Sequence, residues 1–108
     1  MSVIFVSVNQ SYDEDGMTAD QLATVAHRAW PITLATGQRM DHLVAVYAGQ
    51  PLMAWPVLDA YATDETYQTN GGPRPRIGFA LGGPVPVRPE WNIPLDNMRR
   101  GVMFDSNL

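Results

Sequence analysis

Two apolar runs of strand length, separated by a short break, form the clearest pattern in the chain. They cover residues 43–47 and 51–58, and Gly49 lies in the break between them. This pattern predicts a β-hairpin, because glycine readily takes the positive φ that a tight turn needs. The second run contains two prolines, which cannot donate to a strand ladder. We therefore expect that strand to be an edge strand, bent or locally unpaired.

The best-marked helix begins after Thr18, which fits a capping box with Gln21. It ends at Trp30-Pro31, because a residue before proline is disfavoured in the α conformation. Residues 33–36 then fit either a short strand or a turn of helix. Between Thr18 and Trp30, apolar residues recur at helical spacing and form one face for packing on a sheet: Leu22, Val25, Ala26 and Ala29.

Three further strands are predicted at residues 2–8, 76–81 and 101–104. Residues 60–75 show no periodicity and contain adjacent glycines, so we expect a long loop there. One helix cannot cover both faces of an open parallel sheet. We therefore predict one α+β domain over residues 1–108. Its expected form is a small curled, mostly antiparallel sheet or open barrel with one main helix.

The absence of two residue types excludes several chemistries. The chain has no cysteine, so disulfides, thiolate catalysis and zinc–thiolate sites are excluded. All seven basic residues are arginines, so a Schiff-base lysine and a P-loop lysine are excluded as well. The exclusive use of arginine fits either a GC-rich genome or a functional need.

Charge is distributed unevenly. The net charge is −4, with eight acids and two arginines in residues 1–73 but five arginines and two acids in residues 74–104. An acidic protein is poorly suited to non-specific binding of duplex DNA, where phosphate neutralisation supplies most of the affinity. The arginine-rich part can still hold one phosphate or a short strand, or it can be a solvated surface.

No segment of the chain has the features of a membrane span or a signal peptide. No apolar run approaches the roughly 20 residues that cross a bilayer. The first residues carry no basic stretch and soon reach Asn9 and Gln10. We therefore expect a cytoplasmic protein that does not bind membranes.

The sequence offers no recognisable catalytic or metal-binding motif. His27 and His42 are fifteen residues apart and share no ligand spacing with each other or with a carboxylate. No serine lies in a Gly-x-Ser-x-Gly frame, and no glycine-rich phosphate loop is present. We expect no metal, cofactor or catalytic residue, and an unassigned enzyme is the least favoured of three alternatives.

Aromatic and arginine side chains are the remaining candidates for binding. Tryptophans lie at the ends or bends of predicted elements, where they can stack a base but more often pack in a core. Three arginines lie in or beside predicted loops, where binding groups tend to collect. The predicted ligand-binding residues are Trp30, Arg39, Trp55, Arg74 and Arg76.

Residues 22–79 combine several of these features in one order. A helix ends at Trp30, a loop carries Arg39, an apolar strand turns at Gly49, the returning strand carries Trp55, and a strand begins at Arg76 after a loop. This order resembles PUA-like modules, the grouping that includes EVE and ASCH domains. The resemblance implies a five- or six-stranded curled sheet. It also implies a cleft near Trp30, Arg39, Trp55 and Arg76 that binds RNA or a modified base in DNA without catalysis.

Two functions of different class follow. The first is a non-enzymatic binding module that holds a nucleotide, a modified base or a short nucleic acid in a cleft of aromatic and arginine side chains. The second is a small interaction protein, phage-encoded or accessory, that binds and modulates a host protein. The proline-bearing strand and the acidic residues 13–15 would be its contacts. Edge strands also leave a homodimer open.

Overall fold

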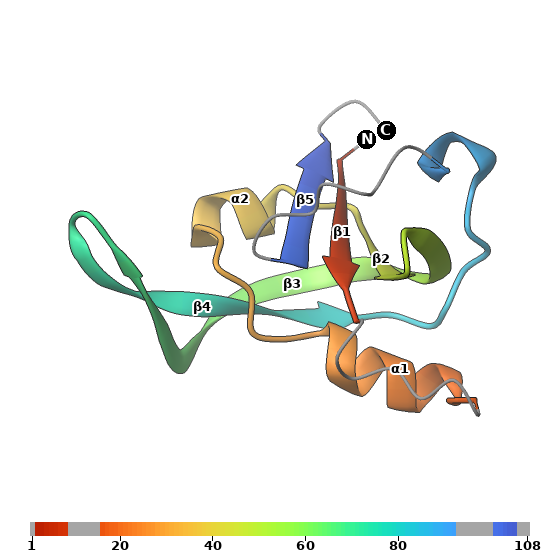
Figure 1. Cartoon of the computed structure of the whole chain (residues 1–108), viewed down its shortest axis with the longest axis horizontal. Helices are drawn as coiled ribbons and strands as arrows, with labels where there is room; N and C mark the ends of the chain where they lie inside the picture. Colours follow the sequence, from red (N-terminus) through yellow and green to blue (C-terminus); the bar gives the residue numbers. More distant parts are fainter. Residues whose placement is uncertain (1, 9–15, 93–100, 106–108) are drawn as a thin grey trace.

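The computed structural model describes residues 2–8, 16–92 and 101–105. These form an open five-stranded sheet with the strand order β4-β3-β2-β1-β5, accompanied by short helices (Figure 1). Strands β1 and β2 run parallel, whereas the other three neighbouring pairs are antiparallel. The elements are β1 Val3–Ser7, α1 Ala19–Ala26, α2 Leu34–Gln38, β2 His42–Tyr47, β3 Gln50–Thr69, β4 Gly72–Leu81, the 3-10 turn η1 Pro89–Trp91 and β5 Val102–Asp105.

The predicted fold class is wrong. We expected an α+β domain with a curled, mostly antiparallel sheet or open barrel and one main helix. Strands dominate instead: β3 has 20 residues, whereas α1 has 8 and α2 has 5. The sheet is open and mixed, because β1 and β2 pair in parallel.

Helix α1 is shorter than expected because the residues that follow it form backbone hydrogen bonds with the edge of β4. The helix ends at Ala26, and the His27 carbonyl accepts a hydrogen bond of 2.7 Å from the Phe79 N–H. Trp30 then forms an isolated antiparallel bridge with Ile77, with both backbone hydrogen bonds at 2.9 Å. The capping box predicted at the start of the helix is confirmed, since Thr18 and Gln21 bond each other's backbone N–H.

Residues 33–36 form the N-cap and first turn of helix α2 rather than a strand. The Thr33 side chain accepts from the Thr36 N–H and caps this helix. Gly37 lets α2 lie directly on the sheet, because a Cβ there would stand only 3.1 Å from Ile77 Cγ2 and 3.2 Å from Ala60 Cβ. The lack of a side chain at one position therefore sets the distance between helix and sheet.

The predicted hairpin is confirmed as β2 and β3. Ala48 and Gly49 form its turn with φ values of 50° and 77°. In the strand order β3 lies between β2 and β4, but it changes partner along its length. It pairs with β2 as far as Pro56 and with β4 from Val57 onward. Within the described residues, positions 50–56 therefore have β2 as their strand neighbour on one side and a single isolated bridge, Ala54 with Val85, on the other. The other proline, Pro51, lies at a register shift.

Strands β1, β2 and β5 and the first part of β3, up to Pro56, form what we call the body. Both faces of its sheet are covered. One face packs Ile4, Leu43 and Trp55 against residues that include Leu22 of α1. The other face packs against Trp91, which is fully buried.

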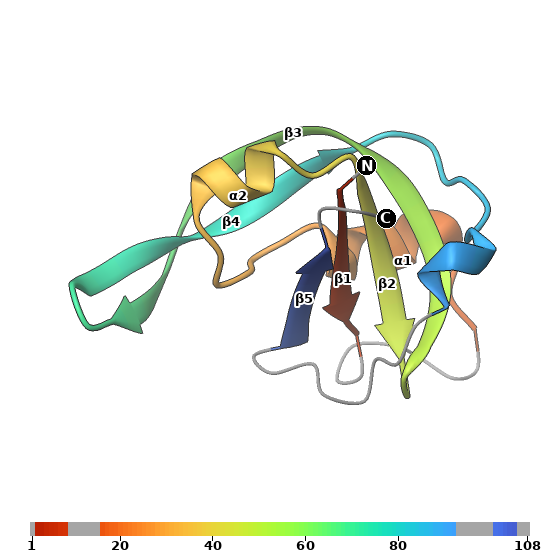
Figure 2. The same cartoon turned by 90° about the horizontal axis from the view of Figure 1, so that it is seen from above.

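The second half of β3 and the first half of β4, residues 61–76, form what we call the arm. It projects beyond the body as a two-stranded ribbon (Figure 2). The expected loop over residues 60–75 is therefore wrong. None of residues 61–76 is buried, so the arm has no hydrophobic alternation from which a strand could be predicted. Asn70-Gly71 at its tip is a recognised turn signal for a hairpin.

No helix within the described residues has both the length and the apolar character needed to cross a bilayer.

Candidate functional site

A cleft lies between the beginning of α2 and the arm, and we call it the Arg74 cleft. Its volume is about 170 Å³. Two separate parts of the chain build it, because α2 rests on β3 and β4 where the arm leaves the body. The lining residues are Ile32, Thr33, Leu34, Tyr67, Arg74, Pro75 and Ile77.

Arg74 is the charged residue of this cleft. It is directly opposite Tyr67 in the β3–β4 register, so the two side chains lie on one face of the arm. Arg74 is exposed, and its side chain makes no hydrogen bond or ion pair within the described part of the chain. A guanidinium that no protein group occupies can form paired hydrogen bonds with a phosphate or carboxylate.

Two other predicted site residues, Arg76 and Trp30, are not among the lining residues, and their polar side-chain atoms already bind backbone carbonyls. The Arg76 guanidinium donates to the carbonyls of Ala29 and Thr66, each at 3.3 Å, and lies 6.0 Å from the centre of the Tyr67 ring. The Trp30 indole N–H donates to the Ala26 carbonyl at 2.8 Å. Arg76 therefore ties the segment after α1 to the arm, whereas the Trp30 indole ties that segment to the end of α1.

The last two predicted residues lie elsewhere. Trp55 is 1% exposed and belongs to the core of the body, so its indole offers no surface to a ligand. Arg39 caps the C-terminal end of α2, and its guanidinium lies 3.4 Å from Thr36 Oγ1. The structure thus places Arg74 and Arg76 on the arm and Trp30 beside Ile77, just beyond the arm, and leaves Trp55 and Arg39 apart.

Tyr67 is the lining residue that the sequence analysis missed. It was assigned to a loop without periodicity, and only the strand register places it beside Arg74. The threonines and tyrosines of residues 61–69, together with Asn70-Gly71, are the signal that could have indicated a hairpin there.

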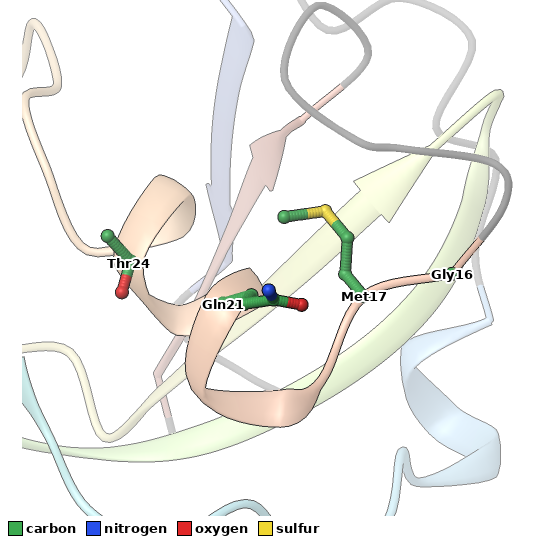
Figure 3. A pocket seen from close by; sticks show the side chains of 4 residues that line it. All are labelled: Gly16, Met17, Gln21 and Thr24. Carbon is green, nitrogen blue, oxygen red and sulfur yellow. The ribbon is translucent and has the colours of Figure 1, made fainter.

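Another hollow, of about 320 Å³, lies beside the N-terminal half of α1 (Figure 3). Its polar side chains already form hydrogen bonds with backbone groups of α1 and its N-cap. Gln21 completes the capping box, and the Thr24 hydroxyl donates to the Asp20 carbonyl at 2.9 Å. Nowhere in residues 2–8, 16–92 and 101–105 do three histidine or carboxylate side chains gather as a metal ion would require.

No protein-family model, curated protein or solved structure matches this chain. The resemblance to PUA-like modules stays a prediction, and the function has to be argued from the side chains of the site.

Proposed function

We propose that this protein is a non-enzymatic binding module that holds a nucleotide, a modified base or a short nucleic acid in the Arg74 cleft. The observation that carries the proposal is the unoccupied Arg74 guanidinium at a mainly apolar cleft, with Tyr67 beside it. In this arrangement Arg74 binds a phosphate, while the Tyr67 ring and the apolar lining contact a base or sugar.

Size and charge restrict the ligand. A volume of about 170 Å³ is below the roughly 300–1,000 Å³ of pockets that enclose a small molecule. Only one ring of the ligand therefore enters the cleft, and its phosphate remains at the surface. The net charge of −4 further favours a contact with one or two phosphates over the many that duplex binding uses.

A titration of short single-stranded oligonucleotides and of mononucleotides tests this proposal. Arg74→Gln should weaken binding and lower the salt dependence by about one phosphate contact. Arg39→Gln is the matched control, because it removes the same charge from an exposed arginine outside the cleft lining. Wild-type protein that binds none of these ligands would refute the proposal, as would equal losses in the two variants.

A protein partner is the second candidate, and a separate observation favours it. Leu58, on β3 where the arm leaves the body, is 70% exposed, and the arm beyond it has no buried residue. A partner that covers the Leu58 side chain removes its apolar surface from water, which favours association. If this candidate is right, Leu58→Asp abolishes a stoichiometric complex with one host protein, whereas Arg74→Gln leaves that complex intact.

A further inference from the structure

A third hollow lies at the other end of β4, between that strand and the last turn of α1. Its volume is about 370 Å³, within the range of small-molecule pockets. Ala23 and Thr24 of α1 form one wall, and residues 79–81 of β4 form the other. Two side chains with ring polar groups, His27 and Tyr61, complete the lining. None of these residues carries a fixed charge.

Backbone and helix contacts fix the orientation of His27. Its carbonyl accepts from the Phe79 N–H, so the residue is tied to β4. Its ring Nδ1 lies 2.7 Å from the Thr24 carbonyl and 3.2 Å from the Ala23 carbonyl. A carbonyl can only accept, so Nδ1 must carry the proton. In the neutral ring, Nε2 is then a hydrogen-bond acceptor.

Gly78 brings Tyr61 to the same hollow. Tyr61 is on β3, opposite Gly78 of β4 in the register. A Cβ at Gly78 would meet the far end of the Tyr61 ring, at 2.7 Å from Cε2 and 2.9 Å from the hydroxyl oxygen. The ring therefore lies across β4 at a position without a side chain. Within the described residues the Tyr61 hydroxyl has no hydrogen-bond partner, so it can donate to a ligand.

We infer that this hollow is a second binding site, independent of the Arg74 cleft, for a neutral planar heterocycle with adjacent N–H and C=O groups. The ligand N–H donates to His27 Nε2, and the ligand carbonyl accepts from the Tyr61 hydroxyl. The apolar walls from Ala23 and residues 79–81 contact the ring. A charged ligand is disfavoured, because no charged group lines the hollow to offset its desolvation.

Uracil is a suitable probe, since it carries this edge, and N,N′-dimethyluracil is the matched compound that lacks both N–H donors. We expect uracil to shift the NMR signals of Ala23, His27 and residues 79–81 in a saturable way, and dimethyluracil to shift them far less. Shifts that gather on Tyr67 and Arg74 instead, or equal effects of both compounds, would overturn the inference. The first of these outcomes would still support the Arg74 cleft.

Three variants test the assigned roles. Tyr61→Phe removes only the hydroxyl, and His27→Asn keeps a donor near the helix carbonyls while it removes the Nε2 acceptor. Each should weaken uracil binding roughly 2- to 12-fold, the effect of one neutral hydrogen bond. Ala23→Phe should fill the hollow and abolish binding. Wild-type affinity in both Tyr61→Phe and His27→Asn would overturn the inference.

Discussion

The body and the arm share the strand β3 but are held together by different interactions. From Gln50 to Pro56 the strand lies between β2 and the segment before η1, and Ala54 and Trp55 on it are buried. From Tyr61 to Thr69 it pairs with β4 alone, and no residue is buried. One strand is therefore part of a packed core and, further along, part of a solvated ribbon.

This difference in burial determines where the protein can place side chains that contact a ligand. Among the described residues, the side chains of the central strands of the body pack into a hydrophobic cluster on each face of the sheet. The arm is free of that constraint, so Tyr67 and Arg74 can face a ligand without loss of core packing. We therefore expect the body to contribute most of the stability, whereas the arm contributes Tyr67 and Arg74 to one candidate site and Tyr61 to the other.

The largest expected effect comes from an aromatic residue in the body. Trp55→Ala should lower the free energy of unfolding by about 3–5 kcal/mol, because it removes a large ring from a closed core and leaves a cavity. Tyr67→Ala, the matched change in the arm, should lower it by less than about 1 kcal/mol. Urea unfolding followed by circular dichroism measures both.

If Trp55→Ala does not fold, the same comparison can be made with Trp55→Phe against Tyr67→Leu. Equal losses in the body and the arm variants would show that the arm is as tightly packed as the body.

The sequence was sufficient for the parts of the body that depend on local patterns. The apolar runs at residues 43–47 and 51–58 and the turn at Gly49 predicted the β2–β3 hairpin, and Thr18 marked the start of α1. The end of α1 was missed because the pairing of Trp30 with Ile77 joins residues far apart in the chain. No local pattern encodes that contact.

The arm and the Arg74 cleft were harder to predict from the sequence. A ribbon solvated on both faces has no hydrophobic period, so the arm was taken for a loop. Arg74 was selected as an arginine near that loop, but its pairing with Tyr67 needed the register. Trp55 lies within an apolar run, and the sequence pattern did not separate a core indole from a stacking one.

The second prediction concerns His42 of the body. Burial and, to a smaller extent, the positive charge of Arg88 lower the pKa of His42 below its ordinary value of 6.5, while Asp41 acts in the opposite direction. Its Nδ1 is buried without a hydrogen-bond partner in the described residues, and its ring lies 5.1 Å from that of Trp91. The folded state therefore favours the neutral ring.

The unfolded chain protonates His42 more readily than the folded protein does. The free energy of unfolding therefore includes a contribution from neutral His42 at pH values above the unfolded pKa, and this contribution is lost as the pH falls below about 6.5. Urea unfolding at several pH values between about 8 and 5 measures the loss. His42→Phe keeps a ring but cannot titrate, so its stability should fall less over the same range. An identical pH dependence in the variant and the wild type would contradict this assignment.

The smallest effect is expected where the arm is tied to the segment after α1. Arg28 lies 2.9 Å from Glu65 and 3.8 Å from Asp64, with 41% of its side chain exposed. Since partly solvated ion pairs contribute about 0–1 kcal/mol, Arg28→Ala should hardly change global unfolding. It should instead speed hydrogen exchange at the amides of residues 66–74, because the arm opens locally without the body. If exchange quickens equally in β1 and β2, arm and body open together, and the division of β3 into two independently stabilised halves is wrong.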